Sequence, residues 1–361
     1  MVPLVRALHV SETSRCSETA TYATELNGSW AIGSIQNSSR RTLPGYTLGQ
    51  VVEACTRFQL ETVHKDPIHV TAHFLRATNV GPAEVRVSVQ KIGKNFTNLS
   101  ADLAQGVSDT HALRDCRVVD HVSTEQGHVR LTSHLIFGDL TPVPDGIPRS
   151  LAAPSPYARR LPLPNHPSAA VRDRMRHTWR FHSLLSWSMD RTILARNAMR
   201  NQIQADTEII GGGGAEWGAW CELTRTEDEI KPSSIPFFGD MFLNLPSLLP
   251  DSEPASHGTS DCWFPTVTMT VEFKARIPSS QDYASRTVGL YSESHFLTDP
   301  HGRHNARVEV WTAPSAIGQG KLEAGWRDKQ YCIAVADQMA LTLPMDLNHR
   351  QGNRNKVVTK L

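Results

Sequence analysis

The feature that most constrains the fold is an internal repeat, because the chain presents the same order of segments twice. One copy begins near Trp30 and ends at Gln105, and the other begins near Trp217 and ends at Gln338. Each copy reads as one short helix followed by several strands. A repeat of this kind predicts two similar units that are stacked into one larger structure.

Alternation of apolar and polar residues predicts half-buried strands in the first copy at residues 20–27, 68–76, 83–90 and 128–137. The segment from Tyr46 to Phe58 instead has apolar residues three and four positions apart, which is typical of a helix with one buried face. Gly93 lies between two strand-like stretches and predicts a hairpin turn.

The second copy is longer: 65 positions separate Phe273 from Gln338, against 31 between Phe74 and Gln105. We expect its helix over residues 235–249, with a buried stripe made of Phe238, Met241, Phe242, Leu245 and Leu249. Strands are expected at 216–224, 263–277, 286–297, 304–312 and 331–343. Residues 173–210 stay ambiguous between strand and helix.

Eight prolines between Pro142 and Pro167 exclude the interior of a helix or a sheet there. We therefore interpret residues 139–172 as a linker that divides a first unit, residues 1–138, from a second unit, residues 173–361.

Composition excludes several classes of function. A net charge of +1, with no basic cluster, argues against nucleic-acid binding, and no run of about 18 apolar residues is present for a membrane span. The six cysteines form no CxxC pair, and His69 and His73 would lie about 13 Å apart on one face of a strand, so no metal site is expected. The chain also lacks the G-x-S-x-G motif of serine hydrolases.

These features predict a cytoplasmic location, because the start of the chain is too short and too soon polar for a signal peptide and the scattered cysteines read as reduced thiols. The ending Thr359-Lys360-Leu361 resembles a peroxisomal address and keeps that location open.

Three motifs of the second copy resemble those of the double hotdog acyl-CoA thioesterase family, including its thioesterase-like branch from fungal biosynthetic pathways. They are Phe238-Gly239-Asp240-Met241, the strand Pro265–Phe273 with Thr266, and Ala334-Val335-Ala336-Asp337-Gln338. The resemblance covers about residues 20–136 and 175–343. It implies an α+β fold in which two tandem hotdog units each wrap an antiparallel sheet around a central helix.

The resemblance implies that Asp240, Thr266 and Gln338 are catalytic. Asp240, placed at the start of the second helix, would position or deprotonate a water, with the N–H of Gly239 or Asp240 holding the thioester oxygen. No cofactor or metal is required for this chemistry. The substrate would be an acyl-CoA or a carrier-bound, polyketide-type thioester, and assembly into homo-oligomers stays open.

Aligning the two copies pairs Asp240 with Tyr46, Thr266 with Pro67 and Gln338 with Gln105, so the first copy is expected to hold a degenerate site. Residues expected to contact the substrate are Phe238, Gly239 and Thr268 of the second copy and Tyr46 and Gln105 of the first.

Two alternatives remain at this stage. One is a hotdog enzyme that catalyses cyclisation, elimination or acyl transfer on a pathway intermediate, because a fold does not determine a reaction. The other is an acyl-binding protein without activity, in which Asp240 only caps a helix.

Overall fold

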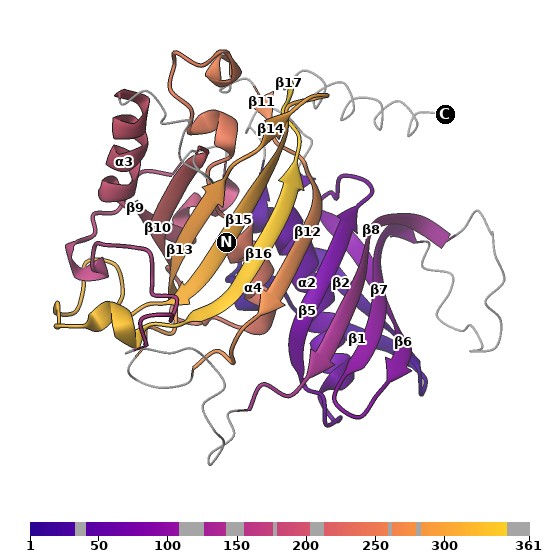
Figure 1. The fold of residues 1–361 in the computed structure, drawn as a ribbon. Coiled ribbons are helices and arrows are strands. Elements are labelled where there is room, and N and C mark those ends of the chain that lie inside the picture. The colour runs from indigo at the N-terminus through magenta and orange to yellow at the C-terminus, as the bar shows by residue number, and fades with distance from the viewer. Residues whose placement is uncertain are drawn as a thin grey trace.

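The two repeats form the two halves of one curved antiparallel sheet (Figure 1). The computed structural model describes residues 1–32, 41–107, 126–141, 155–175, 179–202, 213–258, 262–278 and 283–344. Strands follow one another in the order β1-β2-β6-β7-β8-β5-β12-β16-β15-β13-β10-β9, and β14 pairs with β15. The halves join where β5 pairs with β12, so the backbone hydrogen bonding continues from one repeat into the other.

The strands of the first half are β1 (Val10–Arg15), β2 (Thr19–Leu26), β5 (Asp66–Phe74), β6 (Gly81–Ile92), β7 (Thr97–Val107) and β8 (Gln126–Gly138). Those of the second half are β9 (Leu185–Met189), β10 (Ala215–Leu223), β12 (Thr266–Phe273), β13 (Thr287–Ser294), β14 (Leu297–Thr298), β15 (Arg303–Thr312) and β16 (Cys332–Ala340). Two short pairs stand apart from the sheet: β3 (Ala31–Ile32) with β4 (Arg41–Thr42), and β11 (Cys262–Trp263) with β17 (Leu343–Pro344). The α-helices are α1 (Leu4–Ala7), α2 (Pro44–Gln59), α3 (Arg191–Gln202) and α4 (Ile235–Gly239).

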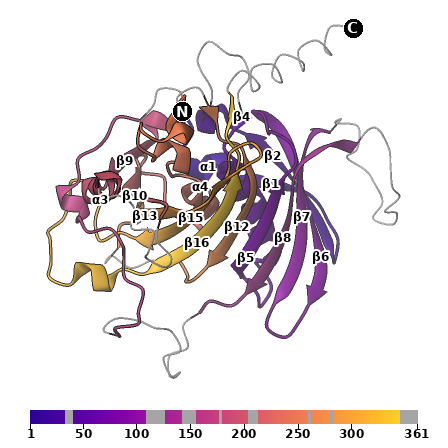
Figure 2. The same ribbon diagram turned by 45° about the horizontal axis from the view of Figure 1, so that its top comes forward.

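Helices α2 and α4 pack together on one face of the sheet (Figure 1), and the curvature of this sheet is visible in Figure 2. Helix α2 confirms the helix predicted from spacing, because Leu48, Val51, Val52 and Phe58 are all buried in the main core. Pro44 occupies the first turn, where its missing N–H leaves no helical hydrogen bond unmade.

Helix α4 corrects the prediction of a helix over residues 235–249. It is only five residues long, and Asp240 is its C-terminal cap rather than its start. A separate 3₁₀ turn follows at Leu245–Ser247. Proline at position 246 and the polar Asn244 between the two turns explain why the apolar stripe did not extend one helix.

A shared β-bulge aligns the repeats. In the first half β5 pairs with β8 through Pro67–Phe137 and then His69–Ile136, and in the second half β12 pairs with β16 through Thr266–Ala340 and then Thr268–Met339. Thr266 thus corresponds to Pro67, as the sequence alignment had it. The strand equivalent to β16 is β8, however, so the counterpart of Gln338 is Leu135, and pairing Gln338 with Gln105 was wrong.

A second, smaller core lies on the opposite face of the second half. Along β10, Trp217 enters the main core and Trp220 the smaller one, as expected of side chains an odd number of positions apart on a strand. Leu161 and Leu163 are fully buried in this smaller core. The described part of the proline-rich segment therefore packs onto the second half.

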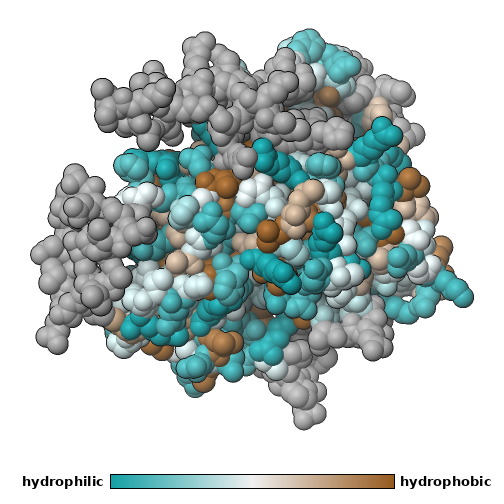
Figure 3. All heavy atoms as spheres, turned by 180° about the vertical axis from the view of Figure 1, so that it is seen from behind, coloured by the Kyte–Doolittle hydropathy of each residue, from teal (hydrophilic) through white to brown (hydrophobic). Residues whose placement is uncertain are grey.

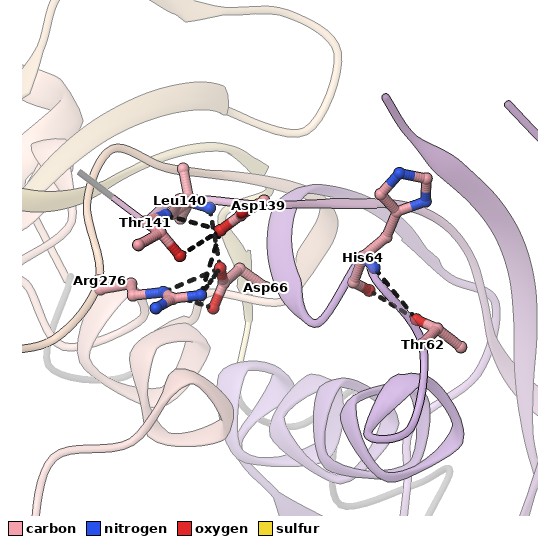
Figure 4. Close-up of polar contacts among 7 residues, drawn as sticks. All are labelled: Thr62, His64, Asp66, Asp139, Leu140, Thr141 and Arg276. Carbon is pink, nitrogen blue, oxygen red and sulfur yellow. Dashed lines mark hydrogen bonds and ion pairs between the residues drawn. The ribbon is translucent and has the colours of Figure 1, made fainter. Parts of the chain in front are cut away.

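Polar contacts also link the two halves at one end of the junction between β5 and β12 (Figure 4). Arg276 follows β12. Its Nε donates to Oδ1 and Oδ2 of Asp66 at 3.1 and 2.9 Å. Its Nη2 donates to Oδ2 of Asp66 at 2.7 Å and to Asp139 at 3.2 Å. Asp66 in turn accepts the backbone N–H of Leu140. This cluster links the start of β5 with the chain leaving β8, on the side of the junction where the two repeats meet.

The surface seen from behind is a mixture of hydrophilic and hydrophobic residues where it is not covered by grey atoms (Figure 3). No helix in the described ranges is long and apolar enough to cross a membrane. Cys55, Cys221 and Cys332 are free thiols, whereas Cys16 is disulfide-bonded, contrary to the expectation that all the thiols are reduced.

Candidate active site

Asp240 of the second half meets the helix of the first half. Its Oδ2 accepts the backbone N–H of Gly45 at 2.8 Å, and Gly45 lies in the first turn of α2. Leu43, the residue at the N-cap position of α2, contributes no side-chain hydrogen bond. The carboxyl of Asp240 therefore caps a helix from the other repeat, where unpaired N–H groups and the helix dipole favour negative charge.

Thr266 reaches this carboxyl because of the bulge in β12. Met269 and Val271 point into the main core, so regular alternation would turn Thr266 away from it. The extra residue between Thr266 and Thr268 restores Thr266 to the inner face, which is how a bulge re-aims a side chain. Thr266 is buried and its hydroxyl donates to Gln338 Oε1 at 3.3 Å.

Gln338 completes the cluster from β16. Its Nε2 donates to the carbonyl of Gly239 at 2.7 Å, which holds the amide against the end of α4. The polar groups of Thr266 and Gln338 also lie close enough to the carboxyl of Asp240 to lower its pKa. The three residues that the resemblance implied as catalytic thus lie together, although 98 positions separate the first from the last.

Opposing electrostatic effects bring the pKa of Asp240 close to neutral pH. Burial raises its pKa from 3.8 to about 7, and the hydrogen bonds from Gly45, Thr266 and Gln338 act in the opposite direction. Part of the Asp240 residue stays exposed to solvent, although its carboxyl is buried. A carboxyl with this pKa has the properties of a general base that works at neutral pH.

The donors available for a substrate oxygen differ from those expected. The N–H of Asp240 donates to the carbonyls of Pro236 and Phe237, so it is not free to bind an oxyanion. Gly239 lies in the last turn of α4, and its role is close packing, since a Cβ there would stand 2.9 Å from Ala336 Cβ. The N–H of Tyr46, next to Gly45, has no hydrogen-bond acceptor among the described residues.

The remaining candidates lie away from the Asp240 carboxyl or serve the fold. Tyr46 points its hydroxyl to the carbonyl of Ala7, and Gln105 bonds the backbone of Asn79 in both directions. Thr268 follows the bulge and faces the other side of the sheet from Thr266. Phe238 is fully buried in the main core.

Gly45 is the residue that sequence reasoning missed. A Cβ on Gly45 would stand 2.2 Å from Pro236 O and 2.6 Å from Asp240 Cβ, so only glycine lets α2 approach α4 this closely. Leu43-Pro44-Gly45 at a helix start, with no capping side chain, is the signal that pointed to an external cap.

Neither a metal-binding group of described residues nor the surface cavity beside Tyr291 belongs to this cluster. Within the described ranges, no group of three or more histidine, cysteine, aspartate or glutamate side chains is placed to hold a metal ion. A cavity of about 560 Å³, lined by Arg159, Arg160, Arg196 and Arg327, lies beside Tyr291 of the smaller core, on the opposite face of the sheet from Asp240.

Two helices wrapped by the halves of one antiparallel sheet define a tandem double hotdog protein. The chain is similar in fold to a solved structure assigned as a thioesterase II from Thermobifida fusca, with 19% identity, TM-score 0.60, and 95% of this chain and 98% of that one covered. It is also similar to acyl-CoA thioesterase II TesB2 from Mycobacterium marinum (12% identity, TM-score 0.57, 94% and 98% covered). A hot dog fold protein of Alicyclobacillus acidocaldarius matches at 12% identity and TM-score 0.55, with 94% and 97% covered.

Residues 27–119 match the family model of the acyl-CoA thioesterase N-terminal domain. The resemblance to the acyl-CoA thioesterase family is thereby confirmed for residues 27–119, and the solved structures extend the similarity in fold to the whole chain. The fungal branch of the family remains a prediction. No curated protein sequence matches the chain significantly.

Proposed function

We propose that the protein hydrolyses acyl thioesters at the cluster of Asp240, Thr266 and Gln338. The observation that carries this proposal is the carboxyl of Asp240, which combines a pKa of about 7 with hydrogen bonds to Gly45, Thr266 and Gln338. The family match over residues 27–119 supports a thioester as the substrate.

In the proposed reaction, Asp240 accepts a proton from a water as that water attacks the thioester carbonyl carbon. The C–S bond then breaks, and Asp240 returns its proton to the leaving thiolate, so that a carboxylic acid and a free thiol are released. Thr266 and Gln338 position the carboxylate and the water, which converts a bimolecular encounter into an oriented one.

The N-terminus of α2 supplies the second element of the mechanism. The N–H of Tyr46 is free of a described acceptor, and it lies one residue from the N–H that holds Asp240. A backbone donor at a helix N-terminus stabilises the negative charge that develops on the thioester oxygen. The reaction thus uses a carboxyl from one repeat and a helix from the other, so the site requires both repeats in their packed arrangement.

Each chain would hold one such site. At the equivalent positions of the first half, Thr266 is replaced by Pro67 and Gln338 by Leu135, which removes a hydroxyl and an amide. We also propose the boundaries of residues 1–138, 139–172 and 173–361 as two hotdog units and their connection. The peroxisomal signal Thr359-Lys360-Leu361 lies outside the described residues.

The proposal is tested by measuring release of free CoA, separated by chromatography, from short, medium, long and aromatic acyl-CoAs. Thioesters on a carrier protein extend the panel to polyketide-type substrates. The variant is Asp240→Asn, which keeps an oxygen for the Gly45 N–H but cannot accept the proton. Turnover by the wild type with a loss of about 10²-fold or more in the variant supports the proposal.

Asp228→Asn provides a matched control. Asp228 is also buried, has a raised pKa caused mainly by burial, and accepts a backbone N–H from the start of a helix, that of Val5 at 2.9 Å. The Asp228→Asn substitution shows how much activity is lost when a buried carboxylate is removed from the fold, because it leaves Asp240, Thr266 and Gln338 unchanged. Equal loss of activity in the two variants would mean that Asp240 acts through stability, and full activity in Asp240→Asn would contradict the proposed mechanism.

A further inference from the structure

Arg41, on β4, carries a positive charge that the described part of the protein does not neutralise. It is half-buried, its Nη1 is buried, and that atom has no hydrogen-bond partner. Burial alone lowers the pKa of Arg41, with no contribution from a nearby carboxylate. The guanidinium remains charged at any physiological pH.

The guanidinium has a defined place in the structure. It lies over the ring of Trp263, 5.0 Å from the ring centroid, so a first-half arginine rests on a second-half aromatic residue. The next residue, Thr42, is buried and its hydroxyl is bonded to Thr47 at 2.9 Å and Thr78 at 2.6 Å. Arg41 is therefore held by the hydrogen-bonded neighbour Thr42 and by a stacking partner, a preorganised arrangement.

Both members of this pair lie close to the proposed catalytic cluster along the chain. Arg41 precedes Gly45 by four residues and Trp263 precedes Thr266 by three, which limits these Cα separations to at most about 14 Å and 11 Å. Gly45 and Thr266 both contact the carboxyl of Asp240. Short stretches of chain thus join the arginine–tryptophan pair to two residues that contact the Asp240 carboxyl.

A buried donor without a partner destabilises a folded protein by about 1–3 kcal/mol, and more when the group is charged. Such a group therefore marks a position where a ligand would supply the missing acceptor. Trp263 covers one face of the Arg41 guanidinium, and the Nη1 group remains without an acceptor. An oxyanion is the acceptor best suited to such a charged N–H donor.

We propose that Arg41, stacked on Trp263, binds an anionic oxygen group of the thioester substrate and makes the enzyme selective for substrates that carry one. This inference rests on the proposed function. The anion is either a carboxylate at the far end of the acyl chain or a phosphate of the CoA carrier, and both present the same chemistry to the guanidinium.

Four thioesters distinguish an acyl carboxylate from a CoA phosphate as the bound anion. They are the hexanoyl and adipoyl esters of CoA and those of N-acetylcysteamine, a carrier that has no phosphate. The adipoyl group has the same number of carbons as hexanoyl but ends in a carboxylate. We compare kcat/KM for the wild type, Arg41→Gln and Arg41→Lys. Arg86→Gln is the matched control, because Arg86 is paired with Glu84 on β6 of the first half.

The proposal predicts that Arg41→Gln lowers kcat/KM by about tenfold or more for the charged substrates only. Loss for both adipoyl esters and neither hexanoyl ester identifies the acyl carboxylate as the anion. Loss for both CoA esters and neither N-acetylcysteamine ester identifies the phosphate. In either case Arg41→Lys recovers part of the activity and Arg86→Gln retains all of it.

An equal effect of Arg41→Gln on all four substrates, or no effect on any, overturns the inference while leaving the hydrolytic function in place. Absence of turnover by the wild type on every thioester overturns the proposed function itself, and this inference with it. The two failures are therefore distinguishable in one set of measurements.

Discussion

The carboxyl of Asp240 accepts the backbone N–H of Gly45 across 195 positions of the chain. Asp240 caps the end of α4 in the second repeat, and the N–H lies in α2 of the first, so neither repeat contains the complete site. Because both helices lie on the same face of one continuous sheet, the site depends on how closely they approach each other.

That approach depends on Gly45, and Gly45→Ala is expected to destabilise the protein. The new Cβ would stand 2.2 Å from Pro236 O and 2.6 Å from Asp240 Cβ, so the helices must separate. Overpacking of this kind reduces the free energy of unfolding by about 1–3 kcal/mol, and a backbone clash places the effect at the upper end. Urea unfolding measures it, together with kcat, which should fall as Asp240 moves.

Gly93→Ala serves as the comparison for Gly45→Ala. The nearest atom to a Cβ on Gly93 is Phe96 O at 3.2 Å, in the turn between β6 and β7. This variant should keep its activity. A Gly45→Ala protein with wild-type stability and activity would show that the close contact between α2 and α4 is not required.

The raised pKa of Asp240 makes a prediction about stability. An unfolded aspartate has a pKa of about 3.9, whereas burial raises that of Asp240 to about 7, so the folded protein binds the proton more tightly between these values. The contribution of Asp240 to the free energy of unfolding therefore decreases as the pH rises through this window, by an amount on the order of 4 kcal/mol.

The Asp240→Asn variant has no ionisable group at this position, so its free energy of unfolding does not decrease with pH for this reason. Relative to the wild type, the variant should gain stability between pH 4 and pH 8, while its activity is lost, which is a trade-off between stability and activity. Urea midpoints of both proteins at the two pH values measure the difference. A difference that does not change with pH would contradict the raised pKa.

Thr266 and Gln338 are expected to act as positioning residues. Both hydrogen bonds lower the pKa of Asp240, so Thr266→Val and Gln338→Leu should each move the apparent pKa of the activity profile upwards and reduce kcat. Gln338→Leu reproduces the Leu135 of the first half, and it also deprives the Gly239 carbonyl of its 2.7 Å donor.

A matched control exists two residues along the same strand. Thr268→Val makes the same substitution on the opposite face of the sheet, beyond the bulge, and should leave the activity profile unchanged. If Thr268→Val and Thr266→Val shifted the profile equally, the effect would reflect the strand and not a hydrogen bond to Asp240.

Periodicity predicted the elements that local sequence determines. Helix α2 and the strands around Phe74 and Phe273 were found because their buried residues recur at the spacings of a helix and a strand. Asp240, Thr266 and Gln338 were brought together by the family resemblance, and no local pattern indicated that they meet. Their contact results from strand pairing between segments that are far apart in the sequence.

Two errors have the same physical origin. The apolar residues from Phe238 to Leu249 suggested one helix, but a short helix and a 3₁₀ turn bury such residues equally well. The pairing of Gln338 with Gln105 relied on position along the chain, whereas the hydrogen-bond ladder makes Leu135 its counterpart. Neither the end of a helix nor the order of strands in a sheet is encoded by hydrophobic spacing alone.

The most direct test of the account is the pH dependence of kcat/KM for the best acyl thioester substrate, measured for the wild type and for Asp240→Asn. The wild type should gain activity with rising pH through an apparent pKa of about 7, because the base must be deprotonated. The variant should be at least about 10²-fold slower and should lack this ionisation. The same ionisation persisting in an active Asp240→Asn protein would contradict the assignment of Asp240 as the base.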